Sequence, residues 1–335
     1  MSDVMNIKEF ARITGFSPAT ISRAFSNRSR VNGKTAEEIL RLAERYNYRP
    51  NRASAASFGN RTQSVGVMIH SLNIDYFAAI FRGIQSEMMK HSYLAIYQEV
   101  LSDASNLKTL RMLIDHRVDG MIMIDLPRDL NRNEKFEISR MNLPVVVVDR
   151  PLGFPEEIDS VETDDETGGR LLADHLLSLG HRRFSLYWVP SNPGRRMTAF
   201  RDAVERCGAL CELWDWKSVS DDDLIRRFRR ADAPTAVFPH NDLLAAHLYR
   251  LIRAAGRRIP QEISVVGYAD LALAELLDPP LTTIRENGFE VGRAAAEILL
   301  KRIYGSTEPP VHRRLPVEIK IRSSAAPVPD ETERR

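Results

Sequence analysis

Cysteine is scarce in this chain, with only Cys207 and Cys211 in 335 residues. The two lie four residues apart on a stretch that we expect to be helical, where they make a weak half-site for a metal; a buried or idle pair is the simpler interpretation. No apolar run is long enough to cross a membrane, and Met1–Phe10 carries charges instead of the apolar core of a signal peptide. These absences predict a soluble protein of the reducing cytoplasm.

Motifs of the common enzyme classes are also missing. The sequence has no glycine loop that would cradle a phosphate, no H-E-x-x-H zinc spacing and no nucleophile elbow. The acidic pair Asp164 and Asp165 is explained more economically as a loop or helix cap than as an acid–base couple. We therefore expect no enzymatic activity, no cofactor and no metal site.

Charge is distributed unevenly along the chain. Residues 1–62 hold 11 Lys and Arg against 5 Asp and Glu, a formal charge of +6, whereas the whole chain carries +2. The remainder therefore carries −4. A basic N-terminal segment joined to a mildly acidic body is typical of a polyanion binder, although basic surfaces are often only solvated.

The stretch Asn6–Phe25 has the pattern of two short helices joined by a tight turn. Ile7, Phe10 and Ala11 follow i, i+3, i+4 spacing, which places them on one apolar stripe. Gly15 interrupts this period and can adopt the positive φ that a tight turn requires.

A second helix is predicted after the turn. Ser17 can cap it, and Pro18 suits its first position, where a missing N–H has no cost. Ile21 and Phe25 then face inward. The outward face carries Pro18, Ala19, Ser22 and Arg23. A helix-turn-helix of this kind can place a helix against DNA, although an ordinary helical corner has the same spacing.

A third helix, capped by Asn32, is predicted to close a small three-helix core. Its apolar residues are Ala36, Ile39, Leu40 and Ala43. The polar, basic loop 26–31 before it could lie along phosphates. Pro50 ends this region, and the small residues of 51–62 form either a flexible linker or a helix that exists only when held.

From Ser64 onwards, strands alternate with helices. We expect strands at 65–69, 93–97, 120–124, 144–149, 184–189, 236–238 and 263–268, and helices at 77–91, 107–115, 168–179, 197–207, 242–255 and 289–304. Near-continuous apolar strands with crossover helices predict an α/β fold with two doubly wound parallel-sheet lobes. Ligands bind beyond the carboxyl ends of such strands. That rule nominates Ser71–Phe77, Asp125, Asp149–Arg150, Pro190–Arg196, Asn241–Asp242 and Tyr268–Asp270.

At this point the chain resembles the LacI/GalR family of transcription regulators over nearly its whole length. The matching motifs are SPATISRAFSN, VNGKT and YNYRPN in the N-terminal segment, and VDG, LPVVVVDR, SVETDDETGG, HLLSLGHRRF, PTAVFPHND, ISVVGYAD and DPPLTTIRENGFEVGRAAAEILL in the body. The resemblance implies a homodimer with a periplasmic-binding-protein-like core and a DNA-binding head on each chain; tetramers are a further option. The implied parts are a helix-turn-helix head (1–50), a hinge (51–62) and an effector-binding and dimerisation core (63–324). The Pro-rich, charged residues 325–335 are expected from their composition to be a disordered tail. Within the core, the N-subdomain takes about 63–161 and part of 287–324, and the C-subdomain about 162–286.

The resemblance also implies a set of DNA contacts. Pro18, Ala19 and Arg23 occupy base-reading places, and Arg23 can bond bidentately to guanine unless it contacts only a phosphate. The other expected DNA-binding residues are Asn6, Ile7, Ser17, Thr20, Ser22, Arg30, Thr35, Asn51, Ser54, Ser57 and Phe58. Ser57 stands where the family has a leucine wedge, so either Phe58 is the wedge in a shifted register or this protein kinks its operator less.

The implied effector contacts are Ser71, Tyr76, Phe77, Asp125, Asp149, Arg196, Trp216, Asp242 and Ala269. Asp242 could instead be a buried helix cap, and Trp216 could be part of the core. Ala269 replaces an aspartate that grips sugar hydroxyls in the family, and Asp270 beside it should point elsewhere. Losing this carboxylate while keeping Arg196 favours a sugar acid or another polar metabolite over a plain hexose.

The sequence thus predicts a cytoplasmic repressor of a carbohydrate or related catabolic operon. A small-molecule effector between the lobes, a sugar or sugar derivative, would control its affinity for a palindromic double-stranded operator. A sugar carrier without DNA binding and an enzyme on a doubly wound sheet are the competing interpretations.

Overall fold

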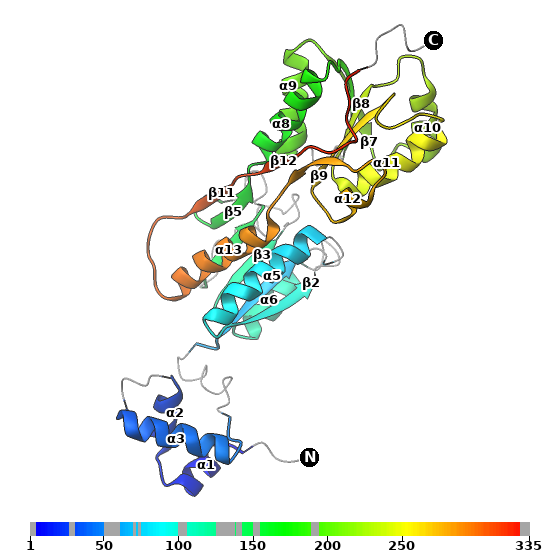
Figure 1. The fold of residues 1–335 in the computed structure, drawn as a ribbon. Coiled ribbons are helices and arrows are strands. Elements are labelled where there is room, and N and C mark those ends of the chain that lie inside the picture. Colours follow the sequence, from blue (N-terminus) through cyan, green and yellow to red (C-terminus); the bar gives the residue numbers. More distant parts are fainter. Residues whose placement is uncertain are drawn as a thin grey trace. The chain divides into compact units, whose positions relative to one another are not determined.

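The structure, a computed structural model, describes residues 5–26, 31–49, 61–69, 72, 75–99, 106–124, 138, 143–149, 155–188 and 194–328. Contacts divide the chain into two compact units. The first comprises Met1–Ser64 with Ile114–Asp119, and the second comprises Val65–Leu113 with Gly120–Arg335. Figure 1 shows the helical head in blue and the α/β core in the other colours.

The head contains the three predicted helices, α1 (Ile7–Thr14), α2 (Pro18–Ser26) and α3 (Gly33–Arg45). Asn6 forms a capping box with Glu9 at the start of α1, and Gly15 adopts a φ of 78° at its end. Ser17 Oγ accepts the N–H of Thr20 at 3.1 Å, and so caps α2 as expected.

A small apolar core holds these helices together. Phe10, Ile21 and Ile39, one from each helix, are fully buried. The ring of Tyr48 stacks on Phe10 at a centroid distance of 4.1 Å. Because this core is so small, the head's stability depends on these few contacts.

The N-lobe contains the first six-stranded sheet, in the order β11-β5-β4-β3-β1-β2. Its strands are β1 (Ser64–Ile69), β2 (Leu94–Glu99), β3 (Met121–Ile124), β4 (Val145–Val148), β5 (Asp159–Thr163) and β11 (His312–Leu315), and its helices are α5 (Asp75–Lys90), α6 (Asn106–Asp115) and α13 (Gly288–Ile303). The strand pairs β1/β3, β3/β4, β4/β5 and β5/β11 are all parallel.

The C-lobe contains the second sheet, in the order β12-β10-β9-β8-β6-β7. Its strands are β6 (Arg183–Trp188), β7 (Leu210–Asp215), β8 (Ala236–Pro239), β9 (Ser264–Ala269), β10 (Thr282–Arg285) and β12 (Glu318–Lys320), and its helices are α8 (Asp165–Ser178), α9 (Gly194–Arg206), α10 (Asp221–Arg229), α11 (Asp242–Ala254) and α12 (Leu273–Leu276). Here β12 pairs antiparallel with β10, whereas the other strand pairs that the structure defines are parallel. Separate apolar clusters on the two faces confirm the doubly wound arrangement.

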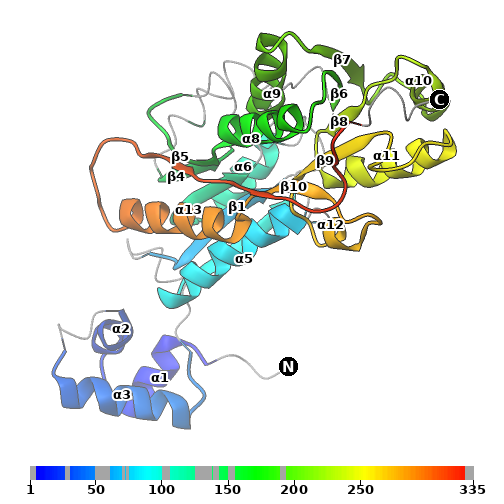
Figure 2. The ribbon, with the colours of Figure 1, turned by 45° about the horizontal axis from the view of Figure 1, so that its top comes forward.

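The chain crosses between the lobes three times: from β5 to α8, from β10 to α13 and from β11 to β12 (Figure 2). The last crossing lets residues 312–320 add an edge strand to each sheet. Ala325 packs on the C-lobe core and Val328 N–H donates to Leu179 at 3.0 Å. The expectation of a disordered tail is therefore wrong for 325–328, while 329–335 lie outside the described residues.

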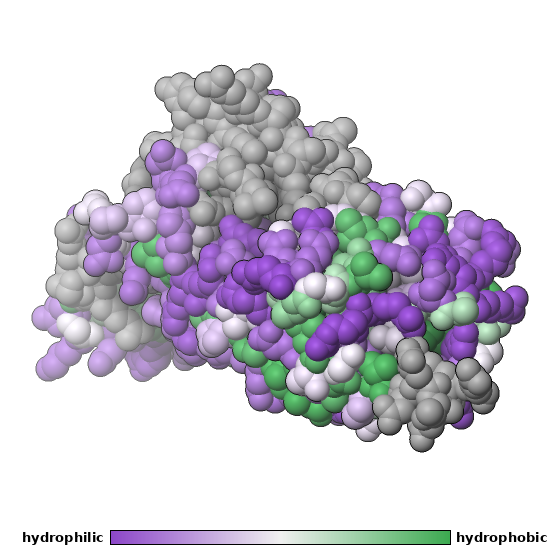
Figure 3. All heavy atoms as spheres, turned by 90° about the horizontal axis from the view of Figure 1, so that it is seen from above, coloured by the Kyte–Doolittle hydropathy of each residue, from purple (hydrophilic) through white to green (hydrophobic). Residues whose placement is uncertain are grey.

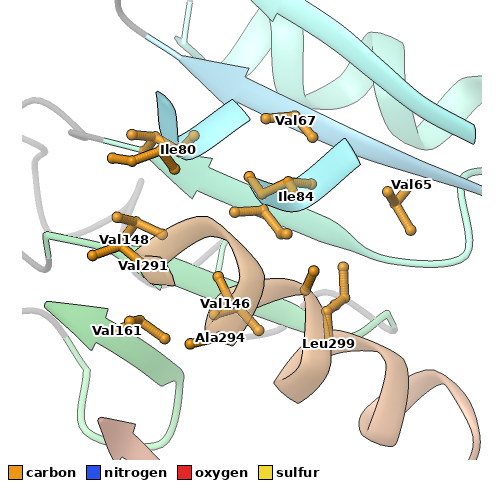
Figure 4. Packing of buried hydrophobic residues seen from close by; sticks show 14 of the residues in the cluster. Val65, Val67, Ile80, Ile84, Val146, Val148, Val161, Val291, Ala294 and Leu299 are labelled. Atoms are coloured by element: carbon orange, nitrogen blue, oxygen red, sulfur yellow. The ribbon is translucent and has the colours of Figure 1, made fainter. Parts of the chain in front are cut away.

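Two helices of the N-lobe approach each other unusually closely. The apolar side chains of α5 and α13, including Ile80, Ile84 and Val291, pack on the same face of the sheet (Figure 4). A Cβ built on Gly292 of α13 would overlap the carbonyl oxygen of Ile80, and one on Gly83 of α5 would overlap that of Phe289. Glycine is thus required where these backbones meet.

The cysteine prediction is wrong in its geometry. Cys207 follows the last residue of α9 and Cys211 lies on β7, so the two do not share a helix. Burial raises the pKa of the Cys211 thiol to about 12. An uncharged thiol is a poor nucleophile and a poor metal ligand, so Cys211 fits the interpretation of an idle residue.

Candidate functional site

The outward face of α2 is the candidate DNA-reading surface. Pro18, Ala19 and Arg23 are exposed, whereas Ile21 and Ala24 are buried. Ser22 is half-buried. The predicted division is therefore correct for Pro18, Ala19, Arg23 and Ile21, whereas Phe25 and Ser22 are both only partly buried.

The residues predicted to contact the DNA backbone differ in how exposed they are. Asn6 Oδ1 accepts the N–H groups of Lys8 and Glu9, each at 3.0 Å, so a phosphate contact would fall to its amide nitrogen. Ile7 and Thr35 are half-buried. The hydroxyls of Ser17 and Thr20 bond to each other at 2.8 Å. Arg30, Asn51, Ser54, Ser57 and Phe58 lie outside the described residues.

Asp119 anchors the chain as it enters β1. One carboxylate oxygen accepts the N–H of Thr62 at 2.8 Å and its hydroxyl at 2.9 Å. The other oxygen accepts the N–H of Gln63 at 2.9 Å. Three hydrogen bonds to one charged group therefore fix the last residue of the hinge segment and the residue after it.

Asp119→Ala is expected to lower the free energy of unfolding by about 1–3 kcal/mol, because three hydrogen bonds to a charge are lost. We also expect weaker operator binding with unchanged effector affinity, since the hinge segment loses its anchor. Thermal denaturation and operator titration measure the two effects. Asp115→Ala, at the exposed end of α6, is the matched control. Equal behaviour of the two variants would contradict the anchoring role.

Arg196 is the centre of a polar cluster where the two lobes meet. Its Nε lies 3.4 Å from Asp165 Oδ2, its Nη1 lies 3.7 Å from Glu286 Oε2, and its guanidinium carbon lies 4.1 Å from the ring centroid of Tyr268. Tyr268 donates to Asp165 Oδ1 at 3.0 Å. Since α8, α9, β9 and the residue directly after β10 supply these groups, the cluster is built at the ends of elements distant in sequence.

The charges of the cluster shift the pKa values of its members. Burial raises the pKa of Glu286 to about 7, because the stabilising charge of Arg196 does not fully compensate and Asp165 adds repulsion. Burial would lower the pKa of Arg196, but Asp165 and Glu286 outweigh it and hold that pKa above its usual value. Arg196 is therefore a permanent cation, and Glu286 can change charge near neutral pH.

The N-lobe contributes Tyr76 and Asp149 to this region. The hydroxyl of Tyr76 donates to Asp149 Oδ2 at 3.5 Å, and Asp149 has a φ of 55° directly after β4. Burial, followed by repulsion from Asp149, raises the pKa of Tyr76 well above its usual value. Phe77 is 9% exposed and packs in the N-lobe core. Ser71 and Asp125 lie outside the described residues.

Two residues predicted to contact the effector, Asp242 and Trp216, lie outside the Arg196 cluster. Asp242 is fully buried and accepts hydrogen bonds from the Thr283 hydroxyl at 2.6 Å and from the Leu271 N–H at 2.8 Å. These bonds favour a buried structural role for Asp242 over contact with an effector. The helix cap itself is Asn241. Trp216 is 39% exposed, so it is not part of the core as the alternative for it had assumed.

Ala269 and Asp270 end β9 in an uncommon conformation. Their φ values are 110° and 53°, both in the region that favours glycine. The Asp270 carboxylate bonds Arg285 Nε at 2.6 Å and Arg322 Nη2 at 2.7 Å. As predicted, it points into its own ion-pair network and does not replace the missing side chain of Ala269.

A separate hollow lies at the opposite, amino ends of β4 and β5. Its volume is about 320 Å³, and it lies beside the buried ion pair of Arg302 and Asp159. Arg302 donates to Asp159 and to the carbonyls of Ser306, Glu308 and Pro309. With its donors so engaged, Arg302 offers little to a ligand.

Comparison with known proteins decides the family. Residues 6–51 match the description "Bacterial regulatory proteins, lacI family", and residues 173–325 match "Periplasmic binding protein-like domain". A LacI family transcriptional regulator from Enterococcus faecium with bound ribose is 30% identical in sequence; the match covers 79% of this chain and 100% of that chain, with a TM-score of 0.69. The chain belongs to the LacI family.

Other LacI-family relatives match along nearly the whole length. The HTH-type transcriptional regulator CelR of Thermobifida fusca is 29% identical over 94% of this chain and 96% of that protein. The structure of the lac repressor dimer bound to operator and the anti-inducer ONPF is 26% identical, covers 96% of this chain and 99% of that chain, and has a TM-score of 0.83. The predicted fold class and the predicted family are therefore confirmed.

Two cluster residues of this LacI-family chain were not predicted to lie at the site: Glu286 and Asp165. Asp165 had been assigned to a loop or cap, but Asp164 is the cap of α8 and Asp165 faces Arg196. Tyr268 begins the segment Tyr268–Asp270, which its position at the carboxyl end of a strand had already nominated. No sequence signal marks Glu286. Within the described part of the chain, no His, Cys, Asp and Glu residues gather as a metal site, and no helix has the length and apolarity to cross a bilayer.

Proposed function

We propose that this protein is a cytoplasmic, homodimeric repressor of a carbohydrate or related catabolic operon, and that a small molecule at the Arg196 cluster controls its operator affinity. The single observation that carries the proposal is the combination in one chain of an exposed reading helix and a charged cluster at the junction of two lobes. The complex of the regulator CelR with cellobiose and the ribose-bound regulator from Enterococcus faecium support a sugar or sugar derivative as the effector.

A linkage between lobe arrangement and DNA binding is the proposed mechanism. Arg195 of α9 pairs with Glu162 of β5 at 2.7 Å, and Arg196 pairs with Glu286 beside the second crossover. A change in the angle between the lobes must change these pairs. An effector that binds one arrangement more tightly shifts the population toward it, and the operator affinity changes by the ratio of its two affinities.

Dimerisation would supply the avidity that a small head lacks. Apolar side chains are exposed on the N-lobe, with Met89 at 68%, Leu94 at 64% and Met112 at 42%. Leu94 begins β2, an edge strand of the sheet. Such residues suit a subunit interface, and a two-fold dimer requires a palindromic operator.

The test is selection of operator DNA from random duplexes, followed by a thermal-shift screen of free and operator-bound protein. The screen contains neutral sugars, sugar acids and sugar phosphates. We expect a selected palindrome and a compound that stabilises free and bound protein unequally. No preference for any duplex at moderate ionic strength would overturn the proposal, and turnover of a sugar phosphate by pure protein would favour an enzyme instead.

A further inference from the structure

Arg195 and Glu162 form an ion pair that joins the two lobes beside the Arg196 cluster. Arg195 Nη1 donates to Glu162 Oε1 at 2.7 Å, and the two side chains are 24% and 16% exposed. Glu162 lies on β5 of the N-lobe, and Arg195 lies in the first turn of α9 in the C-lobe. Because both side chains are largely withdrawn from water, salt screens this pair less than it screens an exposed pair.

Each partner of this pair is fixed to its own lobe. Met197 and Phe200 of α9 are fully buried in the C-lobe core. A Cβ built on Gly169 of α8 would overlap the carbonyl oxygen of Arg196, so α9 also packs closely on α8. Strand β5 pairs with β4 and β11 in the sheet of the N-lobe. A rotation of one lobe against the other must therefore change the length of the ion pair.

A second arginine bonds to the same carboxylate oxygen. Arg314 lies opposite Glu162 in the register of β11 with β5. Its Nε and Nη2 donate to Glu162 Oε1 at 3.3 Å and 3.1 Å, and its Nη1 lies 3.9 Å from Asp164 Oδ1. Since β11 and β5 belong to one sheet, this contact does not depend on how the lobes are arranged.

Arg314 weakens the attraction between Glu162 and Arg195 in two ways. The two guanidinium groups carry like charges and bond to a single oxygen, so each repels the other. Arg314 also keeps the carboxylate paired when Arg195 moves away, and separation then leaves no unpaired charge in a place with little water. The pair between the lobes therefore opens more easily than it would without Arg314.

We propose that Glu162 and Arg195 form a latch that holds the lobes in the arrangement of this structure, and that Arg314 sets how easily the latch is released. A hydrogen bond of this length is lost when its atoms separate by roughly 1 Å, so a small rotation is sufficient. The inference rests on the proposed function for its consequence, because operator affinity is there linked to the arrangement of the lobes. It goes further in assigning that arrangement to one ion pair and its competitor.

The latch predicts opposite effects for the two arginines. Arg195→Gln and Glu162→Gln remove the ion pair, so each should raise the ratio of released to latched protein by about fivefold to tenfold. Arg314→Gln removes the competitor, so it should lower this ratio by about two- to fivefold. A network that only stabilised the fold would respond to all three substitutions in the same direction.

The experiment measures the distance between the lobes of the full chain by pulsed electron spin resonance. One spin label is attached to Cys207, which is exposed directly after α9. The other is attached at the substitution Lys301→Cys, an exposed position on α13 of the N-lobe. Cys211→Ala removes the remaining thiol, and an excess of unlabelled protein limits each dimer to one labelled chain.

Wild type should show one main distance. Arg195→Gln and Glu162→Gln should both add the same second distance. Arg195→Lys keeps the charge without the planar fork of donors, so it should give an intermediate population of the second distance. Adding Arg314→Gln to Arg195→Lys should then reduce that population. Arg170→Gln removes an exposed arginine of α8 and is the matched control, which should resemble wild type.

Two results would overturn the latch: a distance distribution that Arg195→Gln leaves unchanged, or a second population that Arg314→Gln fails to reduce. Operator affinity is measured on the same variants without labels, and it should change in opposite directions for Arg195→Gln and Arg314→Gln. Shifted distances with unchanged operator affinity support the latch and overturn the linkage of the proposed function. Unchanged distances with intact operator binding overturn the latch alone.

Discussion

Arg23→Ala weakens binding to the selected operator by about 10- to 100-fold, because a bidentate contact to a guanine contributes about 1–3 kcal/mol of discrimination. Arg23 is exposed on α2, with buried Ile21 and Ala24 fixing the direction of the helix face. Competition titrations of operator and random duplexes at several salt concentrations measure the effect. The loss should be concentrated on operator DNA.

The control for this prediction is Arg41→Ala, which removes the same charge from an exposed position on α3. Arg23→Lys adds a second comparison, since lysine keeps the charge but cannot form the bidentate contact. An equal loss on operator and random DNA for Arg23→Ala, with affinity retained by Arg23→Lys, would assign Arg23 to a phosphate contact.

Gly292→Ala should lower the free energy of unfolding of the core by about 2–3 kcal/mol. Alanine in the interior of a helix normally stabilises it by about 0.5–1 kcal/mol relative to glycine, so a decrease has the opposite sign to helix propensity. The cause is the overlap of the new methyl group with the backbone of Ile80, which forces α13 away from α5. Chemical denaturation measures the change.

Gly33→Ala, at the start of α3, is the matched control because no heavy atom lies within 4 Å of a Cβ at that position. It should leave stability nearly unchanged or raise it. A Gly292→Ala protein as stable as wild type would show that the two N-lobe helices can separate at little cost, and the close approach would then not be a requirement of the fold.

The head and most core elements were predictable because their signals are local. Asn6, Gly15, Ser17 and Asn32 have side chains or conformations that end or begin helices, and each does so in the structure. Continuous apolar runs such as Val145–Val148 identify buried parallel strands without further information. These elements depend on residues within a few positions of one another.

Elements with mixed polarity were missed. Strand β7 is partly exposed at the edge of its sheet, with Leu210 69% exposed, and its sequence lacks the apolar continuity of the central strands. The short edge strands β11 and β12 carry charged residues for the same reason. Only pairing with a neighbour, a contact distant in sequence, makes these segments strands.

The Arg196 cluster was predictable only in part. Arg196, Asp149 and Tyr76 came from strand ends and family resemblance, but the partners that set the charge of the cluster did not. Glu286 resembles any other acid in the sequence, and its importance comes from burial against Arg196 after two crossovers. Asp242 was nominated from the sequence as an effector contact, but its carboxylate accepts hydrogen bonds from within the protein instead.

Residues 312–320 complete both sheets, and this arrangement has a consequence for synthesis on the ribosome. Neither lobe can acquire its last edge strand until residues 312–320 have been translated, because β11 and β12 come after every other helix and strand that the structure describes. A chain halted before Val311 would leave two open sheet edges, each able to pair with another nascent polypeptide. We expect such fragments to aggregate or be degraded, so that the cell contains full-length regulator and few truncated products able to occupy an operator.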